Sequence, residues 1–284
     1  MSDVDESYVF DTPEPVLVTV DLPHGGVRVV AGDRTDTRVT VSTGSDSPPT
    51  SKVVLAEGVL AITGPTRRRF GWALDRLRGS AAEDVLIEAP AGTRIQATLA
   101  MGEYRCAGPL GECRLTTRYG DIRVEQAGPL QASTAYGDIR VDRATDDAEL
   151  TTSAGELHVR TLDAGGVLKN DYGETRVGHV GGDLQVTGLY GDIRVDRAEA
   201  GVTARTAYGG VRVDDVARGV VDLVTTSGVL EVGIRAGTAA WLDVSSASGR
   251  IRNSLNPRDN PDGFTDTVEV HARTAGGDIV VRRA

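Results

Sequence analysis

The chain is poor in aromatic residues, has almost no cysteine and lacks long apolar runs. Phe, Trp and Tyr together make up 4% of its 284 residues, and there are 2 cysteines. Two cysteines cannot build the disulfide framework of a small secreted scaffold. No apolar run approaches the roughly 20 residues of a membrane-spanning helix. We therefore expect neither a disulfide-stapled domain nor membrane insertion.

A secretory signal is also missing from the printed sequence. Residues 1–8 are acidic and lack the basic start and apolar centre that such signals need. We therefore expect a cytoplasmic protein with reduced thiols. The formal net charge is -10, whereas general nucleic-acid binding requires a basic face. Nucleic acid is accordingly not an expected partner.

Motifs for cofactors and metals are absent as well. There is no Walker loop, and Gly25-Gly26 is not followed by the helix that a dinucleotide fingerprint requires. The four histidines are scattered, and two cysteines without nearby histidines are too few ligands for a metal. The sequence thus predicts no cofactor, no metal site and no catalytic residues.

Glycine is abundant, with 35 residues, and many of the glycines recur at regular intervals in a sequence repeat. The hexapeptide Tyr-Gly-Asp-Ile-Arg-Val begins at Tyr119, Tyr136 and Tyr190, and looser copies surround it. Most anchoring glycines are 17 to 19 residues apart. They are Gly102, Gly120, Gly137, Gly155, Gly173, Gly191, Gly209, Gly228, Gly249 and Gly277. A fixed period this short is typical of a solenoid, with one supersecondary unit per repeat.

Within each repeat the side chains alternate as in a strand. The second and fourth residues after the glycine are apolar, such as Ile193 and Val195, and share one face, so we expect them to point inward. A second strand precedes each glycine. The third residue before the glycine is usually small and polar, which predicts an inward ladder of hydroxyls that donate to the adjacent coil. Those residues are Thr117, Thr134, Thr152, Asn170, Thr206, Thr225, Ser246 and Thr274.

These patterns predict an all-β protein, a parallel β-helix with coils of about 18 residues and two or three short strands per coil. Glycine at the corner provides positive φ or close backbone approach. We divide the chain into a flexible tail (1–9), an irregular β-rich cap (10–84) and the solenoid (85–284). The cap includes a hairpin around Glu57-Gly58 and an arginine-rich loop at 66–84. A long loop (253–266) precedes the last repeat, whose Ile279 and Val281 predict an open edge suited to self-association.

Two groups of residues are candidate binding sites. Tyrosines precede five of the glycines and form a stripe, which either packs on itself along a corner or stacks on sugars. They are Tyr119, Tyr136, Tyr172, Tyr190 and Tyr208. In the arginine-rich loop, Arg67, Arg68 and Arg69 are either ordinary surface residues or a patch for an anion or a partner.

Acidic and basic residues also form columns. An acid follows each glycine from Gly102 to Gly191, and arginine usually stands two residues further on. The columns are either a solvated face that discourages aggregation or an interaction face. A glycosidase-like carboxylate pair is less favoured, because a catalytic pair should break the repeat and these acids are part of it. Cys106 and Cys113 fall at inward positions, either as small buried apolar residues or as a disulfide or redox pair.

The repeated words resemble a bacterial β-strand-repeat family of unknown function, labelled "putative adhesin", and in particular its actinobacterial branch. The similarity extends to residues 10–15, to residues 106–113 with their two cysteines, and to residues 239–243 around Trp241. It implies a right-handed β-solenoid without known catalytic residues. The coil length is also similar to that of the bactofilins, which are cytoplasmic β-helices that polymerise end to end.

The sequence therefore favours a non-enzymatic scaffold or binding module. Its flat, repetitive β faces would engage an unknown protein partner, or the chain itself through the solenoid ends. A carbohydrate-binding surface that uses the tyrosine stripe is the alternative, and a polysaccharide-active enzyme is the third possibility.

Overall fold

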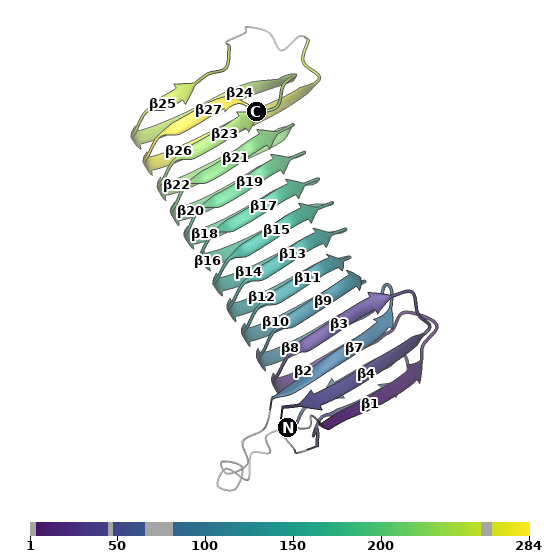
Figure 1. Ribbon diagram of the computed structural model, residues 1–284. Coiled ribbons are helices and arrows are strands. Elements are labelled where there is room, and N and C mark those ends of the chain that lie inside the picture. Colours follow the sequence, from purple (N-terminus) through teal and green to yellow (C-terminus); the bar gives the residue numbers. More distant parts are fainter. Residues whose placement is uncertain (1–3, 45–47, 66–81, 257–262) are drawn as a thin grey trace, which may run out of the picture. The chain divides into compact units, whose positions relative to one another are not determined.

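The computed structural model describes residues 4–44, 48–65, 82–256 and 263–284. It divides into two compact units, Met1–Thr134 and Ala135–Ala284, and each is described by itself. All regular elements in the described ranges are β-strands (Figure 1). The predicted all-β solenoid is confirmed. The arginine-rich residues Arg67, Arg68 and Arg69 lie outside the described residues.

Unit 1 forms two sheets, ordered β1-β4-β7-β3-β9-β11 and β5-β6-β2-β8-β10. Pairing is parallel except for β1 with β4, β4 with β7, and β5 with β6. The antiparallel β5–β6 pair confirms the hairpin around Glu57-Gly58. The strands are β1 (Val4–Asp11), β2 (Leu17–His24), β3 (Val27–Gly32), β4 (Asp36–Thr43), β5 (Lys52–Ala56), β6 (Val59–Thr63), β7 (Glu83–Pro90), β8 (Arg94–Met101), β9 (Tyr104–Pro109), β10 (Cys113–Tyr119) and β11 (Ile122–Ala127), and β12 (Leu130–Tyr136) spans the division between the units.

Strands on both sides of residue 84 share these sheets. β2 lies between β6 and β8, and β3 lies between β7 and β9. The earliest strands are therefore paired like solenoid strands, and only β1, β4 and β5 depart from parallel pairing. The division into a cap and a solenoid at residues 84 and 85 stays a prediction.

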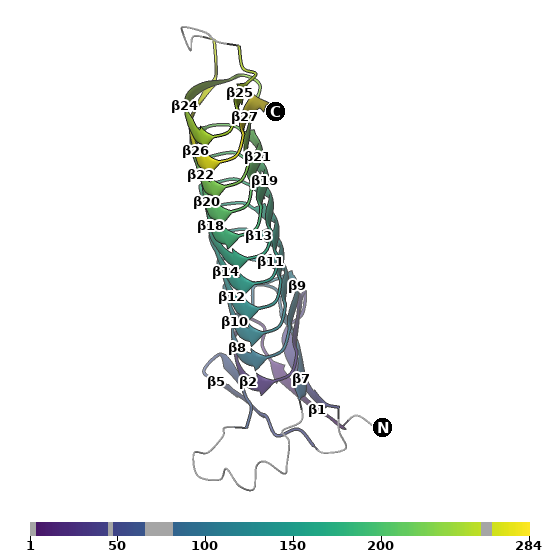
Figure 2. The ribbon, with the colours of Figure 1, turned by 90° about the vertical axis from the view of Figure 1, so that its left-hand side faces the viewer.

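Unit 2 consists of two parallel sheets, ordered β13-β15-β17-β19-β21-β23-β27-β25 and β14-β16-β18-β20-β22-β26-β24. Each coil contributes one strand to each sheet, and Figure 2 shows the coils of this unit edge on. The strands are β13 (Ile139–Ala144), β14 (Ala148–Ala154), β15 (Leu157–Leu162), β16 (Gly166–Tyr172), β17 (Thr175–Val180), β18 (Leu184–Tyr190), β19 (Ile193–Ala198), β20 (Val202–Tyr208), β21 (Val211–Val216), β22 (Gly219–Ser227), β23 (Leu230–Ile234), β24 (Thr238–Ser248), β25 (Ile251–Asn253), β26 (Asp266–Gly276) and β27 (Ile279–Arg283).

The core of each unit lies between its two sheets, and the predicted inward positions fill it. In β19, for example, Ile193 and Val195 are 3% and 0% exposed. The polar ladder is confirmed too, since each member donates to the carbonyl oxygen of a corner glycine in the adjacent coil. Thr152 Oγ1 donates to Gly137 O at 3.0 Å, and Thr225 Oγ1 donates to Gly209 O at 3.0 Å. The ladder thus satisfies carbonyl groups that the turn would otherwise leave unpaired.

The prediction of an open edge at Ile279 and Val281 is wrong. β27 lies between β23 and β25, and both side chains are 0% exposed. The long segment after β25 lets the chain return, so that β26 and β27 pair with β22 and β23. In the described part of unit 2, the outermost strands are instead β24 and β25, which we call the terminal coil.

Candidate functional site

The tyrosine stripe packs on itself in unit 2. Tyr172, Tyr190 and Tyr208 occupy equivalent positions on neighbouring strands. Their ring centroids are 5.2 and 4.9 Å apart, and the ring planes differ by 9° and 10°. Both faces of the Tyr190 ring are therefore covered by other tyrosines. The three rings still expose about half of their surface, so the ladder presents ring edges and hydroxyls to solvent.

The other two predicted tyrosines are also exposed. Tyr119 belongs to unit 1, where it is paired in register with Met101. The Arg118 guanidinium lies 5.8 Å from the centre of the Tyr119 ring, within the range of a cation–π contact. Tyr136 belongs to unit 2 and is 56% exposed. The structure thus stacks Tyr172, Tyr190 and Tyr208 on one another.

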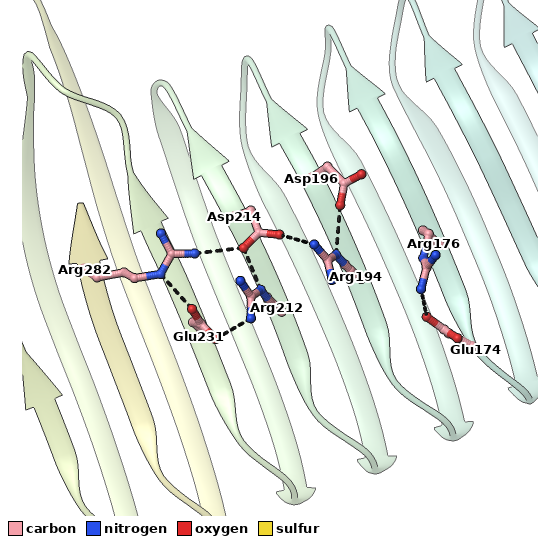
Figure 3. Close-up of polar contacts among 8 residues, drawn as sticks. All are labelled: Glu174, Arg176, Arg194, Asp196, Arg212, Asp214, Glu231 and Arg282. Atoms are coloured by element: carbon pink, nitrogen blue, oxygen red, sulfur yellow. Dashed lines mark hydrogen bonds and ion pairs between the residues drawn. The ribbon is translucent and has the colours of Figure 1, made fainter. Parts of the chain in front are cut away.

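Part of the charged face of unit 2 is a connected network of ion pairs, and Glu174 and Arg176 form a separate pair beside it (Figure 3). Asp214 lies at its centre and accepts from Arg194 at 2.9 Å, Arg212 at 2.6 Å and Arg282 at 2.8 Å. Arg282 also contacts Glu231 at 2.7 Å. The hydrogen bond from Arg282 to Glu231 helps to raise the Arg282 pKa. This network links β19, β21, β23 and β27, so its charges are largely balanced within the sheet.

Two kinds of acid form these ion pairs. Glu174, directly after Gly173, pairs with Arg176 of the same strand region at 2.8 Å. Arg194 turns instead to Asp196 and Asp214, which stand two residues after arginines. Asp196 and Asp214 each follow a valine in the repeat and can be read from the sequence. The contact between Arg194 and Asp214 cannot, because it depends on how adjacent coils align.

The carboxyl groups in the described residues whose pKa is shifted all shift in one direction. Each one with a perturbed pKa has it lowered, namely Asp36, Glu83, Glu199 and Asp243. For Glu199 the cause is hydrogen bonding to Arg235, with contacts of 2.6 and 3.0 Å. A glycosidase acid needs the opposite, a raised pKa that keeps its proton near neutral pH.

Other chemical sites are limited in the described ranges. They contain no cluster of three or more His, Cys, Asp or Glu side chains arranged to hold a metal. None of their elements is a helix long and apolar enough to cross a membrane. Cys106 and Cys113 are both buried free thiols, and burial raises the pKa of each.

The terminal coil differs from the coils below it because its inward residues are partly exposed. Leu242 and Val244 are half-buried and Ile251 is 46% exposed, whereas Val270 and Ile279 in the adjacent coil are 0% exposed. β24 is paired with β26 on one side, and it has no other strand partner among the described residues.

A cavity of about 930 Å³ opens beside the terminal coil. Its apolar lining includes Val220, Trp241 and Leu255, and its polar lining includes Arg218 and Glu269. The Trp241 side chain is 58% exposed, and its ring meets the His271 ring edge-on at 5.5 Å. No motif or repeat position in the sequence indicated this cavity, whose lining combines residues of β22, β24 and β26.

Comparisons with known proteins give a family. The model of the Toastrack DUF4097 family matches residues 19–282. A search of curated proteins found no match. Among solved structures, a "putative adhesin" from Bacteroides fragilis NCTC 9343 is 10% identical, covers 98% of this chain and 96% of its own, and has a TM-score of 0.44. A "putative lipid binding protein" from Parabacteroides distasonis ATCC 8503 is 11% identical, with coverages of 98% and 96% and a TM-score of 0.33.

Proposed function

This chain belongs to the Toastrack DUF4097 family, and we propose that it is a non-enzymatic binding module whose terminal coil joins a second copy of the chain. One observation carries the proposal. The inward side chains of this coil, Leu242, Val244 and Ile251, are partly exposed, although the matching residues of other coils are buried. Burying them against another coil would be favourable by about 25 cal/mol per Å² of apolar surface.

The edge itself supports this proposal. β24 is 11 residues long, and Asp243 is the single charged residue in it. Exposed edge strands are usually kept from pairing by lysines, prolines, bulges or short length. β24 has neither lysine nor proline, so its backbone groups are available to another strand.

Light scattering over a concentration series tests the proposal. We expect the apparent mass of the wild-type chain to rise toward that of a dimer or a longer assembly. Val244→Lys places a charge on the inward face of the terminal coil and should keep the chain monomeric. Ser245→Lys adds the same charge to an exposed outward position on the same strand and should leave assembly unchanged.

Two results would refute this function. One is a monomeric wild-type chain at every concentration, because the exposed coil would then have no affinity for itself. The other is equal loss of assembly in Val244→Lys and Ser245→Lys, which would indicate a nonspecific charge effect. Circular dichroism of both variants confirms that they fold before their masses are compared.

A further inference from the structure

The tyrosine stripe of unit 2 has one gap, at Ala154. Ala154 is aligned with Tyr172 on one side. On the other side, Gly137 N donates to Ala154 O at 2.9 Å, the same bond that Gly173 N makes to Tyr190 O beside Tyr172. The order along the corner is therefore tyrosine, alanine, tyrosine. We call the space over Ala154, between Tyr136 and Tyr172, the tyrosine gap.

The dimensions of this gap follow from the ladder next to it. Successive rings there are 5.2 and 4.9 Å apart. Two coil steps separate Tyr136 from Tyr172 along the corner, which is about 10 Å at the spacing of neighbouring strands and leaves room for one six-membered ring over Ala154. Tyr136 and Tyr172 are 56% and 54% exposed.

Two acidic residues stand close to the gap in the chain. Asp171, directly before Tyr172, is half-buried and forms no side-chain hydrogen bond or ion pair within the described ranges. Glu156, two residues after Ala154, has a side chain that is 63% exposed and 3.4 Å from Arg140. Carboxylates accept hydrogen bonds from hydroxyl groups and repel other anions.

We propose that the tyrosine gap binds a neutral pyranose ring of a glycan. The C–H groups on the two faces of a pyranose carry partial positive charge and stack on the electron-rich faces of Tyr136 and Tyr172. Its hydroxyls radiate from the ring edge, where Asp171 and Glu156 can accept from them. A uronic acid is excluded by those two carboxylates.

Other occupants fit the gap less well. A phenylalanine side chain of a peptide would stack between the tyrosines but would bring no side-chain donor for Asp171. A quaternary ammonium is held best by several aromatic walls around it, and the gap is bordered by two tyrosines. This proposal does not depend on the terminal coil, which lies at a different part of unit 2.

The test uses the full chain with carbon-13-labelled tyrosine, titrated with methyl glucopyranoside, methyl galactopyranoside and cellotetraose. We expect saturable shifts of the Tyr136 and Tyr172 ring signals with at least one of these sugars. Ala154→Tyr fills the gap with the residue that the adjacent coils carry, and it should weaken binding by at least about tenfold.

Ser227→Tyr is the matched control. Ser227 is aligned with Tyr208 at the end of the ladder, so this variant adds a ring to the same stripe away from the gap. It should bind like wild type. Tyr172→Ala, which removes one wall at an exposed position, should bind as weakly as Ala154→Tyr.

Three outcomes would overturn the proposal. The absence of saturable shifts with all three sugars excludes a pyranose site. Equal binding by wild type and Ala154→Tyr places the sugar elsewhere. Titrations with p-cresol and choline complete the set, since a response to either one, together with no response to sugars, assigns the gap to an aromatic or a cationic ligand instead.

Discussion

Two adjacent glycines near the end of the solenoid should respond oppositely to the same substitution. Gly277 is a corner glycine with φ of +146°, a conformation that side-chain-bearing residues rarely adopt. A Cβ built there would lie 2.0 Å from Gly228 O of the neighbouring coil. Gly276 has no such φ, and the nearest atom to its Cβ would be Ser248 Oγ at 3.8 Å. We therefore compare the stability of Gly277→Ala with that of Gly276→Ala, which serves as the control.

The magnitude follows from two terms. A residue held in a glycine-only region costs about 1–3 kcal/mol. The clash with Gly228 O adds to this, because both partners are backbone atoms and one coil must shift. We expect Gly277→Ala to lower the free energy of unfolding by at least about 3 kcal/mol. This is a large fraction of the roughly 5–15 kcal/mol that is typical of a folded domain. Gly276→Ala should be neutral or stabilising by up to about 1 kcal/mol, because alanine restricts the unfolded chain.

Thermal unfolding followed by circular dichroism measures the difference. At roughly 2–4 °C per kcal/mol for a unit of this size, Gly277→Ala should melt about 6–12 °C below wild type. Hydrogen exchange should locate the loss in the coils of β23, β25 and β27. If both alanine variants melt within a degree or two of each other, the corner does not require glycine, and the explanation of the repeated glycines is wrong.

Two further predictions concern unit 1. Burial acts to raise the pKa of Glu83, but hydrogen bonds from Thr50 and Ser51 outweigh it, so the pKa lies below its ordinary value. The ionised carboxylate therefore stabilises the fold above the unfolded-state pKa of about 4.3, and this contribution is lost as pH falls through the folded-state pKa. Between about pH 5 and pH 3, the melting temperature of the wild type should fall further than that of Glu83→Gln. Equal falls in the two melting temperatures would contradict this. Separately, Cys106 and Cys113 are buried with raised pKa values, so a thiol reagent should label them in urea but not in the native chain. Fast native labelling would show that unit 1 opens around them.

Those parts of the fold that repeat could be predicted from the sequence. Ile193, Val195 and their equivalents face inward because strand alternation fixes their side. Thr152 and the other ladder residues follow from the same alternation, since small polar groups recur at one inward position. The tyrosines could be placed at one corner, and packing on one another was one of the two interpretations of the stripe. The angle and spacing of the rings could not be predicted, because ring orientation depends on the neighbouring coil.

The order of strands at the end of unit 2 could not be predicted in this way. The spacing of 28 residues between Gly249 and Gly277 indicates an insertion. This spacing does not indicate whether β26 adds to the outer edge of β24 or inserts between β22 and β24. Strand alternation does not distinguish the two arrangements, since β26 presents the same alternation to β22 as to β24. The partly exposed Ile251 and the cavity near Trp241 follow from that choice and therefore left no periodic signal.

At three places unit 2 departs from the repeat: at Asn170, at Ala154 and in the terminal coil. Neighbouring residues compensate for the first departure but not for the other two. Asn170 replaces threonine in the inward ladder, and the aligned residue in the next coil is Gly188. Because glycine has no side chain, it leaves space for the larger asparagine. Asn170 is 2% exposed and donates to Gly155 O at 3.1 Å, which preserves the ladder. Ala154 has no such compensation, since the tyrosines on both sides of it keep their usual size. The terminal coil has none either, because no described strand covers Val244 and Ile251. Ala154 and the terminal coil are therefore the two departures from the repeat at which we propose that another molecule binds.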